Sequence, residues 1–171
     1  MPRIAVPDGQ DPLMHLWAGT STPVAAAAAG YSDAVYHRTS LGTREMEAAR
    51  ATIARINDCQ VCRTMRAPDG ADAPDEPFYE ALLRGAPAEA GLGEREALAA
   101  EFAERFATDH LGMDDDLWVR LHAAFSDDEL VELALCTGSW LALGRINRVF
   151  DVDGACRIPA EHVGGRSGTA S

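Results

Sequence analysis

The sequence contains no lysine, so arginine supplies all 15 of its Lys and Arg positions. Aspartate and glutamate together number 27, which leaves a formal net charge of −12 at pH 7. Nucleic acids and anionic membranes are themselves negatively charged, and a protein with this excess of acidic residues is repelled by both. The sequence therefore predicts neither a nucleic-acid partner nor a membrane partner.

Long hydrophobic runs are absent as well. The longest run of small apolar residues, VAAAAAG at 24–30, is much shorter than the ~20 apolar residues that a membrane-spanning helix needs. The N-terminal segment MPRIAVPDGQDP contains two acidic residues and lacks the apolar stretch of a signal peptide. We therefore expect a cytoplasmic protein.

Cysteine is scarce, because four cysteines in 171 residues are too few to hold a fold together by disulfide bonds. Hydrophobic residues make up 47% of the chain and charged residues 25%, an ordinary composition for a globular domain with one substantial core. We assign residues 1–10 to a flexible N-terminal segment and 11–157 to a single helical domain. Residues 158–171 are polar and rich in glycine, which predicts a disordered tail.

Alternating patterns of β-branched residues, which mark strands, are nearly absent. Helical periodicity recurs instead, as in the stripe formed by Leu98, Phe102 and Phe106 at four-residue spacing. Ser126 and Glu129 match a capping box, which predicts that the last and longest helix begins there. These patterns predict an all-α bundle with helices at about 11–18, 23–36, 43–57, 59–66, 78–84, 94–110, 114–125 and from 126 onward.

The motif INDCQVCRTMRA contains the cysteine pair Cys59 and Cys62. A cysteine attacks peroxides or disulfides only as the thiolate, which a helix N-terminus, a nearby cation and a second thiol all favour. Asp58 is predicted to cap the helix, which would place Cys59 beside unpaired backbone N–H groups. Arg63 and Arg66 follow within about one turn of the second cysteine. The motif therefore predicts a redox-active pair that can close a disulfide.

Two other interpretations of the cysteines stay open at the level of residues. Cys59 and Cys62 would also serve as small apolar residues that pack one side of a helix. A zinc site would need Cys136 and Cys156 as further ligands, but neither belongs to a second C-x-x-C pair. Cys136 lies within the long last helix and is predicted to be a core residue.

Residues 40–67 resemble the alkylhydroperoxidase D (AhpD) and carboxymuconolactone decarboxylase superfamily. Its redox members carry a glutamate, a C-x-x-C pair that begins twelve residues later, and a histidine four residues after the second cysteine. Glu47, Cys59 and Cys62 occupy the matching positions. The resemblance favours Cys62 as the attacking and Cys59 as the resolving cysteine, whereas the helix dipole alone favours Cys59 as the nucleophile.

What the resemblance implies reaches beyond the cysteines. It implies an AhpD-like helical bundle that reduces a hydroperoxide or another small-molecule substrate without a prosthetic group. It also implies a dithiol protein that reduces the enzyme again, and a homo-oligomer such as a trimer or hexamer.

The sequence departs from this family at two positions. Arg66 stands where the family has its essential histidine, and Val61 stands between the cysteines, where a second histidine is common. Arginine does not release its proton near neutral pH, so Arg66 cannot relay protons. We expect its charge to stabilise the Cys62 thiolate, with Glu47 holding the guanidinium in a bidentate pair. General acid–base catalysis raises a reaction rate by about 10²–10⁴, so a protein without the histidine relay is predicted to be a slow peroxidase. The predicted catalytic residues are Cys59, Cys62, Glu47 and Arg66.

Other polar residues are weaker candidates for this site. His37, ten residues before Glu47, offers a substitute base, although an exposed helix position is the stronger interpretation. His162 falls in the predicted tail. The segment GRINR offers Arg145 and Asn147 to a pocket, although a polar helix end with cations near its C-terminus is the stronger interpretation.

Two alternative functions accompany the redox interpretation. The first is a decarboxylase that acts on a small lactone acid through Arg63, Arg66 and Glu47, which the retained cysteine pair disfavours. The second is a non-catalytic oligomeric helical module in which the C-x-x-C pair is vestigial.

Overall fold

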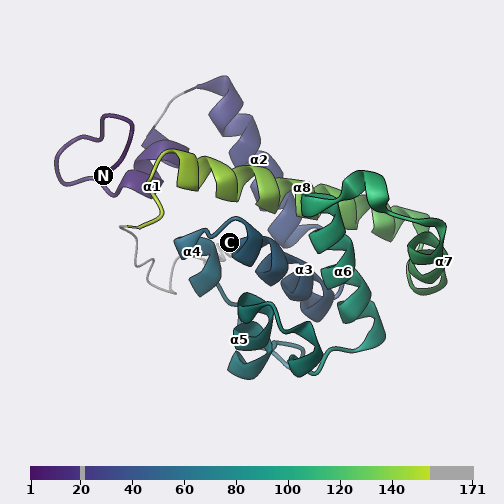
Figure 1. Ribbon diagram of the computed structural model, residues 1–171. Helices are drawn as coiled ribbons and strands as arrows, with labels where there is room; N and C mark the ends of the chain where they lie inside the picture. Colours follow the sequence, from purple (N-terminus) through teal and green to yellow (C-terminus); the bar gives the residue numbers. More distant parts are fainter. Residues whose placement is uncertain (20–21, 155–171) are drawn as a thin grey trace, which may run out of the picture.

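The computed structural model describes residues 1–19 and 22–154, and every regular element within them is helical (Figure 1). The predicted all-α bundle is therefore confirmed, while the predicted tail, 158–171, lies outside the described residues. In chain order the elements are α1 (Pro12–Met14), η1 (His15–Gly19), α2 (Pro23–His37), α3 (Thr43–Ile56), α4 (Gln60–Thr64), α5 (Glu76–Arg84), η2 (Pro87–Glu89), α6 (Glu94–Thr108), η3 (His110–Gly112), α7 (Asp115–Ala124) and α8 (Asp127–Val149).

The ends of the helices follow local capping signals in the sequence. At the start of α8, the Ser126 hydroxyl accepts the Glu129 N–H at 3.3 Å and the Glu129 carboxylate accepts the Ser126 N–H at 2.8 Å, as the capping box predicts. The first predicted helix, 11–18, is instead divided into the short α1 and the π-helical turn η1. None of the helices within residues 1–19 and 22–154 has the length and hydropathy needed to span a membrane.

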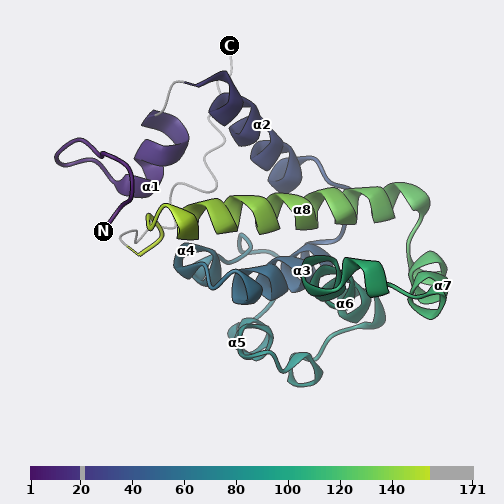
Figure 2. The same ribbon diagram turned by 45° about the horizontal axis from the view of Figure 1, so that its top comes forward.

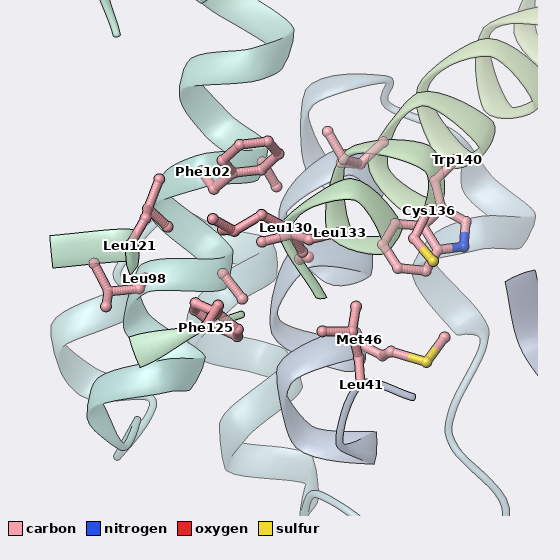
Figure 3. Packing of buried hydrophobic residues seen from close by; sticks show 14 of the residues in the cluster. Leu41, Met46, Leu98, Phe102, Leu121, Phe125, Leu130, Leu133, Cys136 and Trp140 are labelled. Atoms are coloured by element: carbon pink, nitrogen blue, oxygen red, sulfur yellow. The ribbon is translucent and has the colours of Figure 1, made fainter. Parts of the chain in front are cut away.

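Helix α3 is the centre of the bundle, because α4, α5, α6 and α8 all pack against it. Its alanines Ala48, Ala49 and Ala51 are almost fully buried and allow these neighbours to approach closely. The main hydrophobic cluster lies where α6, α7 and α8 meet α3, and Figure 3 shows part of its side chains. Cys136 belongs to this cluster at 2% exposure, which confirms it as a core residue. Burial raises the pKa of its thiol to about 11.

The first part of the chain forms an N-terminal arm, made of α1, η1 and α2. Figure 2 shows the arm on one side of α8 and α5 on the other. Only Leu13 and Val35 of the arm are buried, so it packs loosely against the bundle. Residues 1–10 contain no helix, and the Arg3 N–H donates to the Phe150 carbonyl at 2.9 Å, next to the end of α8.

Candidate functional site

Cys59 and Cys62 are joined by a disulfide bond at the start of α4. Cys59 is itself the N-cap of this helix, and its sulfur accepts the Cys62 N–H at 3.3 Å. The prediction that Asp58 caps the helix is therefore wrong. Asp58 lies in the tight turn between α3 and α4 with a left-handed φ of 48°, and its carboxylate faces Arg63 and Arg148.

The two sulfurs differ in accessibility. Cys59 is completely buried, at 0% exposure, within a small cluster that contains Leu13, Val61 and Val152. Cys62 is partly exposed and lines a cavity. A small molecule can therefore reach Cys62 and not Cys59, which favours Cys62 as the attacking cysteine.

The cavity beside Cys62 has a volume of about 280 Å³ and lies between the N-terminal arm and the bundle. Its lining includes Trp17 and Tyr36 of the arm, Ile53 of α3 and Trp140 of α8. The Trp17 indole N–H donates to the Asn147 side-chain oxygen at 2.8 Å, which fastens the arm to α8. Most of the lining is apolar, so the cavity suits the apolar part of a small ligand.

Glu47 and Arg50 form a buried ion pair on α3. Arg50 donates from Nε and Nη2 to the two carboxylate oxygens of Glu47 at 2.9 and 2.6 Å, and the side chains of both residues are less than a tenth exposed. Burial acts to lower the pKa of Arg50, but its hydrogen bonds with Glu47 and the Glu47 charge outweigh burial and raise it. Arg50 also donates to the carbonyls of Cys62 at 2.8 Å and Met65 at 2.9 Å, so the pair holds α4 against α3.

The expected pair between Glu47 and Arg66 is not formed. Arg66 instead donates from Nε and Nη2 to Glu76 at the start of α5, at 2.6 and 3.0 Å, and its guanidinium lies over the Tyr79 ring. Its hydrogen bond lowers the pKa of the Glu76 carboxyl. Arg66 is absent from the cavity lining, whereas Arg50 is present. The register of α3 explains the change, because Arg50 lies one turn from Glu47 on the same helix.

A buried carboxylate beyond α8, which the sequence analysis missed, lies against the start of α4. Asp153 has a fully buried side chain and accepts the Gln60 N–H at 2.8 Å, and its other oxygen is 3.4 Å from Arg148. The Gln60 N–H is one of the unpaired amides that would otherwise stabilise a Cys59 thiolate. Asp153 occupies that donor and adds negative charge, so the dipole argument for Cys59 loses much of its force.

No protein-family model matches this chain, and no curated protein matches it. The solved structures that are similar to it include two at 20% sequence identity. One is an uncharacterized peroxidase-related protein from Silicibacter sp. TM1040, with a TM-score of 0.61 over 74% of this chain and 68% of that one. The other is a protein of unknown function from Agrobacterium tumefaciens, described as a candidate antioxidant defence protein AhpD, with a TM-score of 0.60 over 79% and 92%. The chain has the AhpD-like fold.

Within this AhpD-like fold, Asn57 joins the cysteine region to α8. Its side-chain amide donates to the carbonyls of Trp140 and Leu141 at 3.0 and 3.2 Å, and its oxygen accepts from Arg145 at 3.2 Å. The close approach depends on Gly144. A Cβ at that position would lie 2.5 Å from the Asn57 amide nitrogen and 3.6 Å from the Cys62 sulfur.

Gly144→Ala is therefore expected to destabilise the protein, although alanine is the better helix former. The clash displaces Asn57, and such overpacking costs about 1–3 kcal/mol. Gly138→Ala on the same helix is the matched control, because its Cβ would meet only one atom, at 4.0 Å. This control should gain about 0.5–1 kcal/mol. Urea unfolding of both variants measures the difference, and equal stability changes would contradict the close packing.

The remaining polar candidates are placed as follows. His37 ends α2 with its ring bound to Asp33, is more than half exposed and does not line the cavity. The interpretation of GRINR as only a polar helix end is corrected, since Gly144 and Asn147 line the cavity. His162 lies outside the described residues, and so does Cys156, which the zinc interpretation needs. The part of the chain that the structure describes holds no group of three His, Cys, Asp or Glu placed to bind a metal.

Proposed function

We propose that this protein is a dithiol–disulfide oxidoreductase that reduces an organic hydroperoxide through Cys62 and Cys59. One observation carries the proposal. In an AhpD-like fold, a C-x-x-C disulfide presents one buried sulfur and one sulfur at the wall of an apolar cavity. A partly exposed cysteine paired with a resolving cysteine is the usual arrangement of a redox-active thiol.

The reaction balances with these two cysteines alone. The Cys62 thiolate attacks the terminal peroxide oxygen, the O–O bond breaks, and the alkoxide leaves and takes up a proton as the alcohol. Cys62 is now a sulfenic acid. The Cys59 sulfur then attacks Cys62, its proton leaves with the hydroxyl as water, and the disulfide forms. Two electrons have passed from the thiols to the hydroperoxide, and a dithiol protein is the proposed source of the next two.

The surroundings of Cys62 favour a slow reaction. Glu47 is bound through both of its oxygens to Arg50, and Arg66 is bound to Glu76, so neither is free to move a proton to or from the thiol. Without a relay, a loss of about 10²–10⁴ in rate is expected relative to a fold member that has one. The same contacts count against a lactone-acid decarboxylase that uses Arg66 and Glu47.

Cellular location and assembly belong to the proposal as well. A cytoplasmic protein fits a reversible cysteine pair, since the reducing cytosol regenerates the thiols. A trimer or hexamer would cover the exposed apolar side chains of α2 and α8, among them Val24, Val131 and Leu135.

Thiol titration against a hydroperoxide tests the function. Reduced protein treated with less than one equivalent of cumene hydroperoxide should lose two thiols for each hydroperoxide consumed. Peptide mapping should place the new disulfide between Cys59 and Cys62 and leave Cys136 free. Cys156→Ser serves as a control that should behave like the unmodified chain. Thiols that survive excess hydroperoxide would overturn the proposal and favour the non-catalytic module.

A further inference from the structure

Almost every arginine in the described part of the chain has an acidic partner. Within residues 1–19 and 22–154, Arg3 and Arg145 alone form no ion pair. The paired ones are Arg38, Arg44, Arg50, Arg55, Arg63, Arg66, Arg84, Arg95, Arg105, Arg120 and Arg148. In a chain with a net charge of −12, a guanidinium without a carboxylate needs an explanation.

Arg145 lies beside the cavity that contains Cys62. It follows Gly144, the residue whose Cβ position is 3.6 Å from the Cys62 sulfur. Its Nε donates to Asn57 at 3.2 Å, and Asn57 lines the cavity. The residue is exposed, and no hydrogen bond from its two terminal nitrogens is formed within the described residues. Arg145 does not itself line the cavity, but its guanidinium, with two free donors, is held against the cavity residue Asn57.

Of the other arginines near this end of α8, Arg3 has its charge directed at Asp151, and two more face carboxylates. Arg63 faces Asp58, and Arg148 faces both Asp58 and Asp153. Arg50 lines the cavity, but Glu47 occupies two of its nitrogens and main-chain carbonyls take its remaining contacts. Arg145, which is bound to the cavity residue Asn57, is thus the nearby cation without a carboxylate partner.

We propose that Arg145 binds the carboxylate of a substrate whose apolar body fills the cavity and whose reactive group reaches Cys62. A planar guanidinium with two free N–H donors suits a carboxylate, which it binds bidentately. A cavity of about 280 Å³ suits an aromatic or short branched body and excludes a long chain in a compact form. The ligand class is a small carboxylic acid that carries a hydroperoxide or a disulfide. Its role as substrate rests on the proposed function, whereas its binding does not.

Binding of an unreactive probe tests the site directly. 4-Isopropylbenzoate carries the carboxylate and an apolar body, and 4-isopropylbenzyl alcohol is its uncharged counterpart. Trp17 and Trp140 line the cavity, so tryptophan fluorescence reports occupancy, with calorimetry as the second readout. The benzoate should bind at least about tenfold more tightly than the alcohol, because a charge-assisted hydrogen bond is worth about a factor of ten or more.

Matched variants separate a specific contact from the general charge. Arg145→Gln should remove the preference for the benzoate and leave alcohol binding unchanged. Arg120→Gln changes the net charge equally, but Arg120 pairs with Glu101 on α6, away from the cavity, so this variant should keep the preference. Equal binding of both probes, or a preference that survives Arg145→Gln, would overturn the inference.

Reaction rates show whether the bound acid carries a hydroperoxide or a disulfide, and they separate this inference from the proposed function. For hydroperoxides, carboxylated cumene hydroperoxide is compared with cumene hydroperoxide. For disulfides, 3,3′-dithiodipropionate is compared with bis(2-hydroxyethyl) disulfide. Arg145→Gln should slow the reaction of the acid from the true substrate class by about tenfold and leave the reaction of its uncharged counterpart unchanged. If the function is wrong, the benzoate binds without any thiol reaction. If the inference is wrong, cumene hydroperoxide oxidises the thiols and Arg145→Gln changes nothing.

Discussion

Cys62→Ser is expected to reduce hydroperoxide consumption to the level of a buffer blank. Cys59→Ser should instead stop the reaction at the Cys62 sulfenic acid. The reason is the different position of the two sulfurs, since Cys62 lines the cavity and Cys59 is fully buried. In Cys59→Ser, the sulfenic acid on Cys62 has no resolving thiol, so one hydroperoxide is consumed per chain. Dimedone labelling followed by peptide mass spectrometry should find an adduct on Cys62 in this variant.

Cys136→Ser is the control for that experiment, because Cys136 lies in the core with a pKa raised to about 11 by burial. It should leave the consumption of hydroperoxide unchanged. A dimedone adduct on Cys59 in Cys62→Ser, at the rate seen for Cys62 in the partner variant, would reverse the assignment of the two cysteines. It would also mean that the helix dipole outweighs accessibility in this protein.

Arg50→Met is expected to destabilise the fold by about 3–5 kcal/mol, the typical cost of leaving a buried charge without its partner. Glu47 would remain within a helix that is buried on all sides, with none of its present hydrogen bonds from Arg50. The carbonyls of Cys62 and Met65 would also lose their donor. Urea unfolding of the oxidised protein, with the disulfide intact, measures the loss.

The double variant Glu47→Gln with Arg50→Met is the informative comparison for this pair. It removes the buried negative charge, so it should recover part of the stability lost in Arg50→Met alone. Arg44→Met is a matched control, since its pair with Glu96 is partly exposed and such pairs contribute about 0–1 kcal/mol. A loss in Arg50→Met no larger than that in Arg44→Met would contradict a structural role for the buried pair.

Much of the fold was predictable because helix ends depend on local chemistry. The capping box at Ser126 and Glu129 sets the start of α8 without reference to any other part of the chain. The start of α4 was predicted less well, because Asp58 is a preferred capping residue by type and Cys59 is not. The tight turn after α3 places Cys59 at the cap instead, and the left-handed backbone of Asp58 is a consequence of that turn.

The partners of the charged residues depended on tertiary structure. Glu47 and Arg50 are one turn apart, a spacing that signals an ion pair in any helix, and this signal was available in the sequence. The contact between Arg66 and Glu76 was not, because it depends on the path of the loop that brings α5 back to α4. Likewise, no local pattern indicates that Asp153 returns to the first amide of α4 or that Trp17 closes the cavity.

The central claim is that Cys62 is the cysteine that a small molecule can reach, whereas Cys59 is buried, and site-resolved alkylation of the reduced protein tests it most directly. Iodoacetamide at pH 7 followed by peptide mass spectrometry gives a separate rate for each cysteine. Cys62 should react faster than Cys59, because Cys62 lines the cavity and Cys59 is fully buried. If the two rates are equal, or if Cys59 reacts faster, the proposed chemistry of this site is contradicted.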